Sequence, residues 1–209
     1  MRRILANVAI MMFIVYIQND FVDIKNSFYI LENRIKDSCE FIENGVRSES
    51  IVLDSKDECK NSILKKIEKE YEIDAVVDND RIFAINEDIN IEVNIYSIYS
   101  TTYMDINLIN YDENSNISKL MKEINKLQSD KTYKVKYYKY IKGKINKDED
   151  ILDKINKDKI LKNLEILDIH NGYVGTAYLL YGVKVNLVKS SYNSGSYFMI
   201  GSPILFTTY

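Results

Sequence analysis

A strict alternation of apolar and polar residues is the feature that most restricts the fold of this chain. It runs through residues 89–98 and 101–109, where every second residue is apolar: Ile91, Val93 and Ile95, then Met104, Ile106 and Leu108. A period of two is typical of strands with one buried and one solvated face. Further strand-like runs lie at 73–77, 81–85, 164–170, 173–180, 183–189 and 196–206. The sequence therefore predicts an extensive antiparallel sheet with one covered face.

Helical periodicity elsewhere supplies the expected cover. Apolar residues recur at helical spacing from Ile24 to Asn44, and Gly45 can end that helix. After an extended stretch over 46–54, Ser55 is the expected N-cap of a second helix. The inner face of this second helix would carry Ile63, Leu64, Ile67 and Tyr71. A third helix is expected over 117–127 and a less regular one over 151–161, with a strand over 132–142 between them.

This order of elements occurs twice, at a spacing of about 90 residues. Ile91, Val93 and Ile95 align with Val183, Val185 and Leu187. The turn Asn79-Asp80 aligns with Asn171-Gly172. We therefore predict an α+β fold built by duplication of a helix–strand–helix unit followed by antiparallel strands, with the helices packed on twisted antiparallel sheets. The first unit would span 21–111 and the second 112–209.

Residues 1–20 are expected to direct export. Arg2 and Arg3 precede an uncharged apolar run from Ile4 to Ile17, which is typical of a signal peptide or an N-terminal membrane anchor. The run is shorter than the roughly 20 residues of a comfortable membrane span, and a buried core helix is the alternative. Export predicts an extracytoplasmic protein, either secreted or attached to the membrane through this segment. Export and the formal net charge of -3 both argue against a nucleic-acid partner.

Few residues suggest catalytic chemistry. His170 is the one histidine of the chain and stands beside the turn signal Asn171-Gly172, so we expect it to end a strand. The pattern S-x-x-K occurs at Ser62–Lys65 and S-x-N at Ser191–Asn193, but the first falls inside an amphipathic helix and no K-[TS]-G follows the second. No catalytic residue, cofactor or metal site is predicted.

Two further features remain open at the level of sequence. Cys39 and Cys59 lie on the apolar stripes of the first two predicted helices, so they form a disulfide if those helices pack side by side and are otherwise two buried thiols. The run 131–144 mixes lysines and tyrosines, which suits an anionic polymer or membrane headgroups but also an ordinary strand with one solvated face. We take Tyr138, Tyr140, Tyr192 and Tyr197, with the loop 190–196, as the candidate interaction surface.

Essentially the whole exported chain resembles the YwmB-like family, most specifically near its C-terminus. The segment Gly201-Ser202-Pro203-Ile204, shortly before the final Tyr209, matches the closing I-G-[TS]-P-I…Y signature of that family. The Lys-Gly-Lys stretch around Gly143, the segment 170–176 with Asn171 and Gly172, and the strand 182–186 stand where the family has similar segments. The resemblance implies a TATA-box-binding-like fold in an uncharacterised extracytoplasmic protein of spore-forming Firmicutes. It carries over no catalytic residue, and we expect structural roles for these signature positions.

Together these features predict a non-enzymatic binding or accessory protein of the cell envelope, with a role related to sporulation. Its partner would be an envelope protein or polymer whose identity the sequence leaves open. The alternative is an enzyme that modifies an envelope polymer through carboxylates brought together by the fold.

Overall fold

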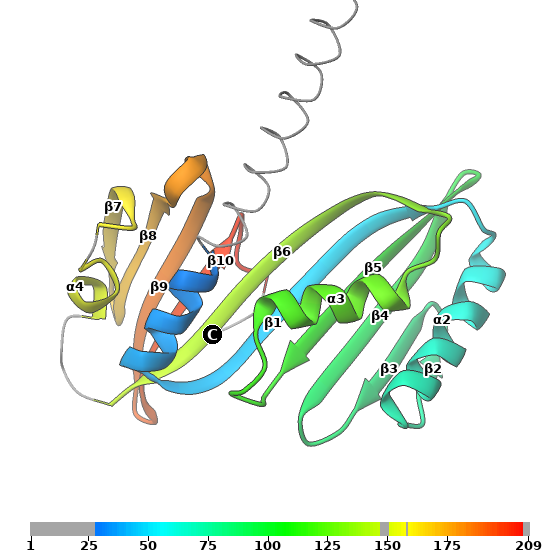
Figure 1. Ribbon diagram of the computed structural model, residues 1–209, viewed down its shortest axis with the longest axis horizontal. Coiled ribbons are helices and arrows are strands. Elements are labelled where there is room, and N and C mark those ends of the chain that lie inside the picture. The colour runs from blue at the N-terminus through cyan, green and yellow to red at the C-terminus, as the bar shows by residue number, and fades with distance from the viewer. Residues whose placement is uncertain (1–27, 147–150, 158, 207–209) are drawn as a thin grey trace, which may run out of the picture.

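The predicted strands form a single ten-stranded antiparallel sheet (Figure 1). The structure is a computed structural model that describes residues 28–146, 151–157 and 159–206. The strands are β1 (Glu40–Val52), β2 (Val76–Asp78), β3 (Arg81–Ile85), β4 (Ile89–Ile98), β5 (Thr101–Asn110), β6 (Thr132–Ile145), β7 (Lys162–Ile169), β8 (Gly172–Tyr178), β9 (Lys184–Tyr192) and β10 (Gly195–Ser202). Their order across the sheet is β2-β3-β4-β5-β1-β6-β10-β9-β8-β7. The chain is thus a mixed helix-and-sheet protein, as expected.

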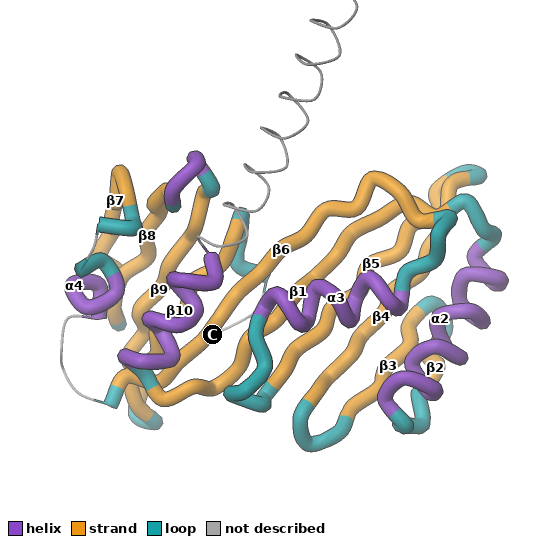
Figure 2. The backbone as a smooth tube through the Cα atoms, in the orientation of Figure 1, coloured by secondary structure: helices purple, strands orange, loops and turns teal. Residues whose placement is uncertain are grey.

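Alternation decides which side of each strand is buried. In β4 and β5 every second side chain is buried, and these are the apolar residues that the sequence singled out. The buried side chains face the helices, which lie on one face of the sheet (Figure 2). We call the opposite face the open face.

The helices begin and end largely where local signals place them. Helix α2 (Lys56–Tyr71) starts at Ser55, whose side chain accepts from the Glu58 N–H while the Glu58 carboxylate accepts from the Ser55 N–H. Helix α3 (Ile117–Leu127) is capped by Asn116. The predicted helix over 151–161 is reduced to α4 (Ile151–Ile155), and a short 3₁₀ turn, η1, covers Leu180–Gly182.

The first predicted helix, from Ile24 to Asn44, extends beyond the helix in the structure. The described part of it covers 28–38, and β1 begins at Glu40 and runs straight through Gly45. Ile42 matches the helical stripe by coincidence, whereas Asn44, Val46 and Ser48 are buried in alternation, as a strand requires. Gly45 serves close packing instead, because a Cβ there would lie 2.3 Å from Cε1 of Tyr140.

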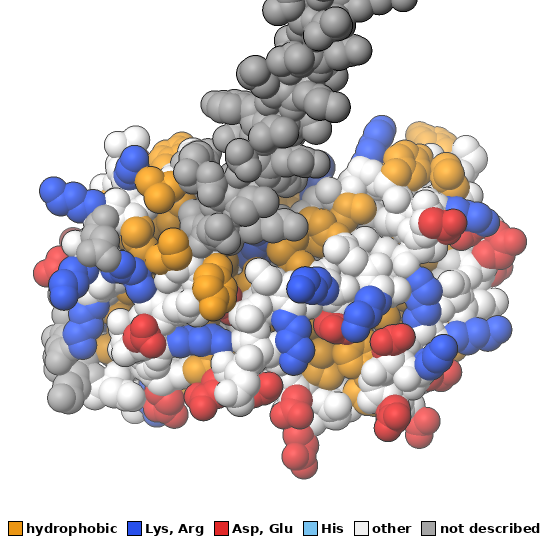
Figure 3. Space-filling model, viewed as in Figure 1, with side chains coloured by type: hydrophobic (Ala, Val, Ile, Leu, Met, Phe, Trp, Pro, Cys, Tyr) orange, Lys and Arg blue, Asp and Glu red, His pale blue; other side chains and the backbone are white. Residues whose placement is uncertain are grey.

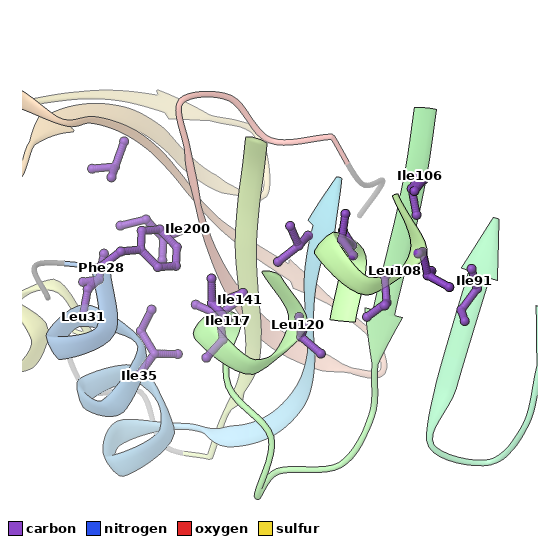
Figure 4. Packing of buried hydrophobic residues seen from close by; sticks show 14 of the residues in the cluster. Phe28, Leu31, Ile35, Ile91, Ile106, Leu108, Ile117, Leu120, Ile141 and Ile200 are labelled. Carbon is purple, nitrogen blue, oxygen red and sulfur yellow. The ribbon is translucent and has the colours of Figure 1, made fainter. Parts of the chain in front are cut away.

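One hydrophobic core runs under all the helices. Helix 28–38 lies across the β6 and β9–β10 side of the sheet, and α3 lies across β1 and β5 (Figure 1). In the core, Phe28 and Leu31 lie near Ile200, and Ile117 lies beside Ile141 (Figure 4). Each of these two helices therefore covers at least one strand that is distant from it in sequence.

A buried carboxylate connects these two helices. Glu32 is fully buried and accepts hydrogen bonds from Asn44 Nδ2 (2.8 Å) and from the backbone N–H of Ile117 (3.1 Å), at the start of α3. Asn110 Nδ2 donates in turn to Asn44 Oδ1 (3.0 Å). Burial raises the pKa of Glu32, although these donors oppose the shift.

The strand order reads the same from both edges of the sheet. From one edge to the centre it is β2-β3-β4-β5-β1, and from the other it is β7-β8-β9-β10-β6. The central strands β1 and β6 pair antiparallel, with Val46 opposite Lys139. Rows of paired residues can therefore be counted outward from this centre and compared between the two halves of the sheet, β1–β5 and β6–β10.

Candidate binding groove

A hollow lies on the open face of the second half. It has a volume of about 720 Å³, within the range of roughly 300–1,000 Å³ that is usual for small-ligand sites. We call it the tyrosine groove. Its lining residues are Ile42, Lys142, Val188, Ser190, Tyr192, Asn193, Ser194, Tyr197 and Met199.

Strand pairing explains why these side chains meet. Met199 of β10 pairs with both Lys142 of β6 and Val188 of β9, so one row crosses three strands. Tyr197 pairs with Ser190 in the next row towards the β9–β10 hairpin. Side chains in adjacent rows two residues apart project from the same face.

The two tyrosines form the walls. The ring centroids of Tyr192 and Tyr197 lie 6.3 Å apart with an angle of 50° between the planes. Tyr197 Oη contacts Ser194 Oγ (3.4 Å), and Gly195 turns the hairpin with a φ of +132°, a conformation that favours glycine. The groove therefore combines aromatic walls with a floor of Val188, Met199 and Ile42.

One cation lies in the groove. Lys142 Nζ is 5.9 Å from the centroid of the Tyr197 ring and 3.9 Å from Glu43 Oε1. Its side chain is 18% exposed, so its charge is partly withdrawn from water. Glu43 also accepts a hydrogen bond from Tyr140 Oη (3.1 Å).

On the open face of the first half, ion-paired side chains and two stacked tyrosines occupy the region that corresponds to the tyrosine groove. Arg47 contacts Glu49 (3.0 Å) and Asp105 (3.2 Å), and the rings of Tyr96 and Tyr103 stack with centroids 5.4 Å apart. Burial and Glu49 raise the pKa of Asp105, although Arg47 opposes the shift. A depression of about 250 Å³ remains there, lined by Arg47, Arg81, Glu92, Asn94, Asp105, Asn107 and Phe206.

The candidate surface residues divide into two pairs. Tyr192 and Tyr197 lie together in the groove with Ser190, Asn193 and Ser194 of the predicted loop. Tyr140 is fully buried under Phe206, with ring centroids 4.9 Å apart, so its assignment to a surface was wrong. Tyr138 lies elsewhere on β6 and donates to Glu49 (2.8 Å). Sequence reasoning did not single out Lys142, although the lysine and tyrosine run 131–144 pointed to its strand.

The signature positions have packing roles at the C-terminal end. A Cβ on Gly201 would lie 2.8 Å from Leu205 and 2.9 Å from the Lys139 carbonyl, so only glycine lets the tail turn back over the open face. Ser202 Oγ donates to the Lys184 carbonyl (2.9 Å), and Asn186 Nδ2 donates to the carbonyl of Pro203. Pro203 follows a cis peptide bond and lies beyond β10 rather than inside it.

The other two signature glycines, Gly143 and Gly172, are also closely packed against neighbouring residues. A Cβ on Gly143 would lie 2.5 Å from Cβ of Cys39. Asn171 and Gly172 form the predicted hairpin between β7 and β8, and Gly172 passes against the Lys189 carbonyl. His170 is exposed beside this turn.

The two cysteines are free thiols in this structure. Cys39 packs against Gly143 of β6, whereas Cys59 Sγ lies 3.8 Å from Met104 Sδ of β5. Their helices do not lie side by side, so the condition set for a disulfide is not met (Figure 1). Burial raises the pKa of each thiol to about 11, which favours the unreactive protonated form.

The described residues offer little else for catalysis or metal binding. Ser62 lies on α2 and Ser191 on β9, at opposite ends of the sheet, so the two serine motifs do not meet (Figure 1). No cluster of three His, Cys, Asp or Glu residues suited to a metal occurs in the described part of the chain. Within those same ranges, no helix has both the length and the apolarity to cross a membrane. The predicted export segment 1–20 lies outside the described residues.

Comparison with known proteins gives no family. No protein-family model matches the sequence, and no curated protein does. Among solved structures, the chain is similar to DynU16, a protein from the dynemicin biosynthetic locus, with 10% identity and a TM-score of 0.29 over 76% of this chain and 86% of that one. This likeness is too weak to bear on fold or function.

Proposed function

We propose that this protein is a non-enzymatic binding or accessory protein of the cell envelope that holds its ligand in the tyrosine groove. The observation that carries the proposal is the groove itself: a hollow of ligand size with aromatic walls, an apolar floor and the partly buried cation of Lys142. On the helix-covered face, the described Lys, Arg, Asp and Glu side chains are interspersed with one another and with apolar patches (Figure 3).

The location is part of the same proposal. Arg2, Arg3 and the apolar run that follows would place the described body outside the membrane, either secreted or tethered. The YwmB-like resemblance, with its link to sporulation, supports this setting through Gly201, Ser202 and Pro203, which the fold uses to direct the C-terminal tail.

We further propose that the body arose by duplication. The shared strand order of the two halves supports it, as does the start of β6 at Thr132, 92 positions after the start of β1 at Glu40. Duplication leaves one copy free to fill its open face and the other to keep a groove.

Binding to isolated bacterial cell walls tests the function. Full-length protein should co-sediment with the walls, and Tyr192→Ala combined with Tyr197→Ala should reduce the bound fraction at least about tenfold. Tyr99→Ala is the matched control, because Tyr99 is 99% exposed on the hairpin that joins the corresponding strands of the first half. Equal loss in the control, or no loss in the double variant, would overturn the proposal.

An envelope-polymer-modifying enzyme is the second candidate. Glu92 and Asp105 line the same 250 Å³ depression, which brings two carboxylates to one place. Each also contacts an arginine, Glu92 with Arg81 at 3.8 Å and Asp105 with Arg47 at 3.2 Å, and this favours a structural role. Release of reducing sugars from cell walls, lost in Asp105→Asn and Glu92→Gln, would favour the enzyme.

A further inference from the structure

The lining of the tyrosine groove points to a particular chemistry of ligand. Its walls are the rings of Tyr192 and Tyr197, and its floor is Val188, Met199 and Ile42. A flat molecule with C–H bonds on its faces can pack against such rings and remain partly in water. The faces of a pyranose sugar have this character.

The rim supplies groups that match sugar hydroxyls. Ser194 carries a hydroxyl and Asn193 an amide, both on exposed residues, so each can both donate and accept. A purely apolar chain in the groove would take these groups out of water without replacing their hydrogen bonds, at a cost in binding free energy. The groove therefore favours a ligand that is apolar on its faces and polar at its edge.

The charge selects an acidic ligand. Lys142 lies in the groove, and Lys144, two residues further along the same face of β6, pairs with Tyr197. The carboxylate nearest to Lys142 among the described residues, that of Glu43, is 3.9 Å away and already accepts from Tyr140. An anionic group on the ligand would gain a partly desolvated cation next to an aromatic wall.

The surroundings suit a chain of sugars rather than one ring. A second depression, of about 590 Å³, shares Val188 with the groove and continues along the open face past Thr176 and Asn186. It gives an extended polymer a path beyond the groove.

We propose that the tyrosine groove binds an acidic sugar unit of an envelope glycan, with its ring against Tyr192 and Tyr197 and its carboxylate at Lys142. This inference rests on the proposed function, since it names the ligand of the same site.

Two disaccharides that differ by one lactyl group, and therefore by one carboxylate, test it. The full-length protein would be titrated with N-acetylglucosaminyl-N-acetylmuramic acid and with di-N-acetylchitobiose, which lacks the lactyl carboxylate, and binding followed by saturation-transfer NMR. We expect the acidic disaccharide to bind about tenfold more tightly. Lys142→Gln should remove this preference. Lys136→Gln should keep it, because Lys136 pairs with Glu49, about 20 Å along β6 from the groove.

Each other result has a defined meaning. Equal affinity for the two disaccharides, or a preference that survives Lys142→Gln, overturns the acidic sugar. Binding of oleate at the groove without binding of either sugar shows an amphiphile site and also overturns it. If cell walls are retained through Tyr192 and Tyr197 while neither disaccharide binds, the sugar inference fails and the binding function stands.

Discussion

The two halves of the sheet share a strand order but differ on the open face. Counted outward from β1, one row holds Glu49, Asp105 and Asn94, and the next holds Ile51, Tyr103 and Tyr96. Counted outward from β6, the matching rows are Lys142, Met199 and Val188, then Lys144, Tyr197 and Ser190. Asp105 and Asn94 of the first half thus correspond to the apolar Met199 and Val188 of the second. The stacked pair Tyr103 and Tyr96 corresponds to Tyr197 and Ser190. The groove is the space that these differences leave.

The charges differ in the same way. Arg47 contacts two carboxylates, at 3.0 and 3.2 Å, whereas Lys142 has one at 3.9 Å among the described residues. A cation balanced by two close anions has little attraction left for a ligand, while one with a single distant partner retains more. This difference supports the proposal that the second half is the one that binds.

The largest expected effect concerns the pairing of β1 with β6, where the two halves of the sheet meet. In Gly45→Ala the new methyl group would overlap the ring of Tyr140, which is buried between Gly45 and Phe206. Overpacking of this kind should lower the free energy of unfolding by about 3 kcal/mol, measured by urea denaturation. Adding Tyr140→Ala should recover at least about 1 kcal/mol relative to the sum of the two single changes. Strict additivity would mean that the two residues do not share this space.

The second prediction fills the groove by copying the first half. Ser190→Tyr places a ring opposite Tyr197, as Tyr96 stands opposite Tyr103. Binding to cell walls should fall by about 30-fold, because the ring occupies the ligand's place. Since Ser190 is buried, the larger side chain should also lower the free energy of unfolding by about 1–3 kcal/mol. Ser97→Tyr, at an exposed position of β4 outside the groove, is the control. Unchanged binding in Ser190→Tyr would show that the groove is not the site.

Local signals predicted the elements well, because they act over a few residues. The alternation around Ile91 and Met104 and the cap at Ser55 needed no knowledge of the rest of the chain. The groove could be foreseen only in part: Tyr192 and Tyr197 flank one hairpin, whereas Lys142 joins them through pairing of β6 with β10 over more than fifty residues. The burial of Tyr140 likewise depends on Gly45 and Phe206, which no local pattern connects.

A third prediction compares the covered faces. Glu32 bonds Asn44 of β1, while the matching position on β6, Tyr137, donates to Asn125 of α3. The pKa of Glu32 in the folded protein is raised above its ordinary value of 4.5. Between pH 4.5 and this raised pKa, the folded protein therefore binds more protons than the unfolded chain. The stability that protonated Glu32 contributes below pH 4.5 is therefore lost as the pH rises through the pKa of Glu32 in the folded protein. Glu32→Gln should therefore gain stability relative to the parent as the pH rises from about 4.5 to 8, measured by urea denaturation at a series of pH values. A constant difference across this range would contradict the shift.

The smallest effect tests the charge difference directly. Glu43→Gln removes the carboxylate next to Lys142 but keeps an amide oxygen that can accept from Tyr140. Because the one carboxylate paired with this lysine among the described residues is then gone, affinity for the acidic disaccharide should rise about threefold, and that for di-N-acetylchitobiose should stay the same. Asp105→Asn in the first half removes a carboxylate from Arg47 in the same manner and should change neither affinity, since Arg47 lies outside the groove. A gain in Asp105→Asn equal to that in Glu43→Gln would mean that overall charge, rather than the position of Lys142, determines binding.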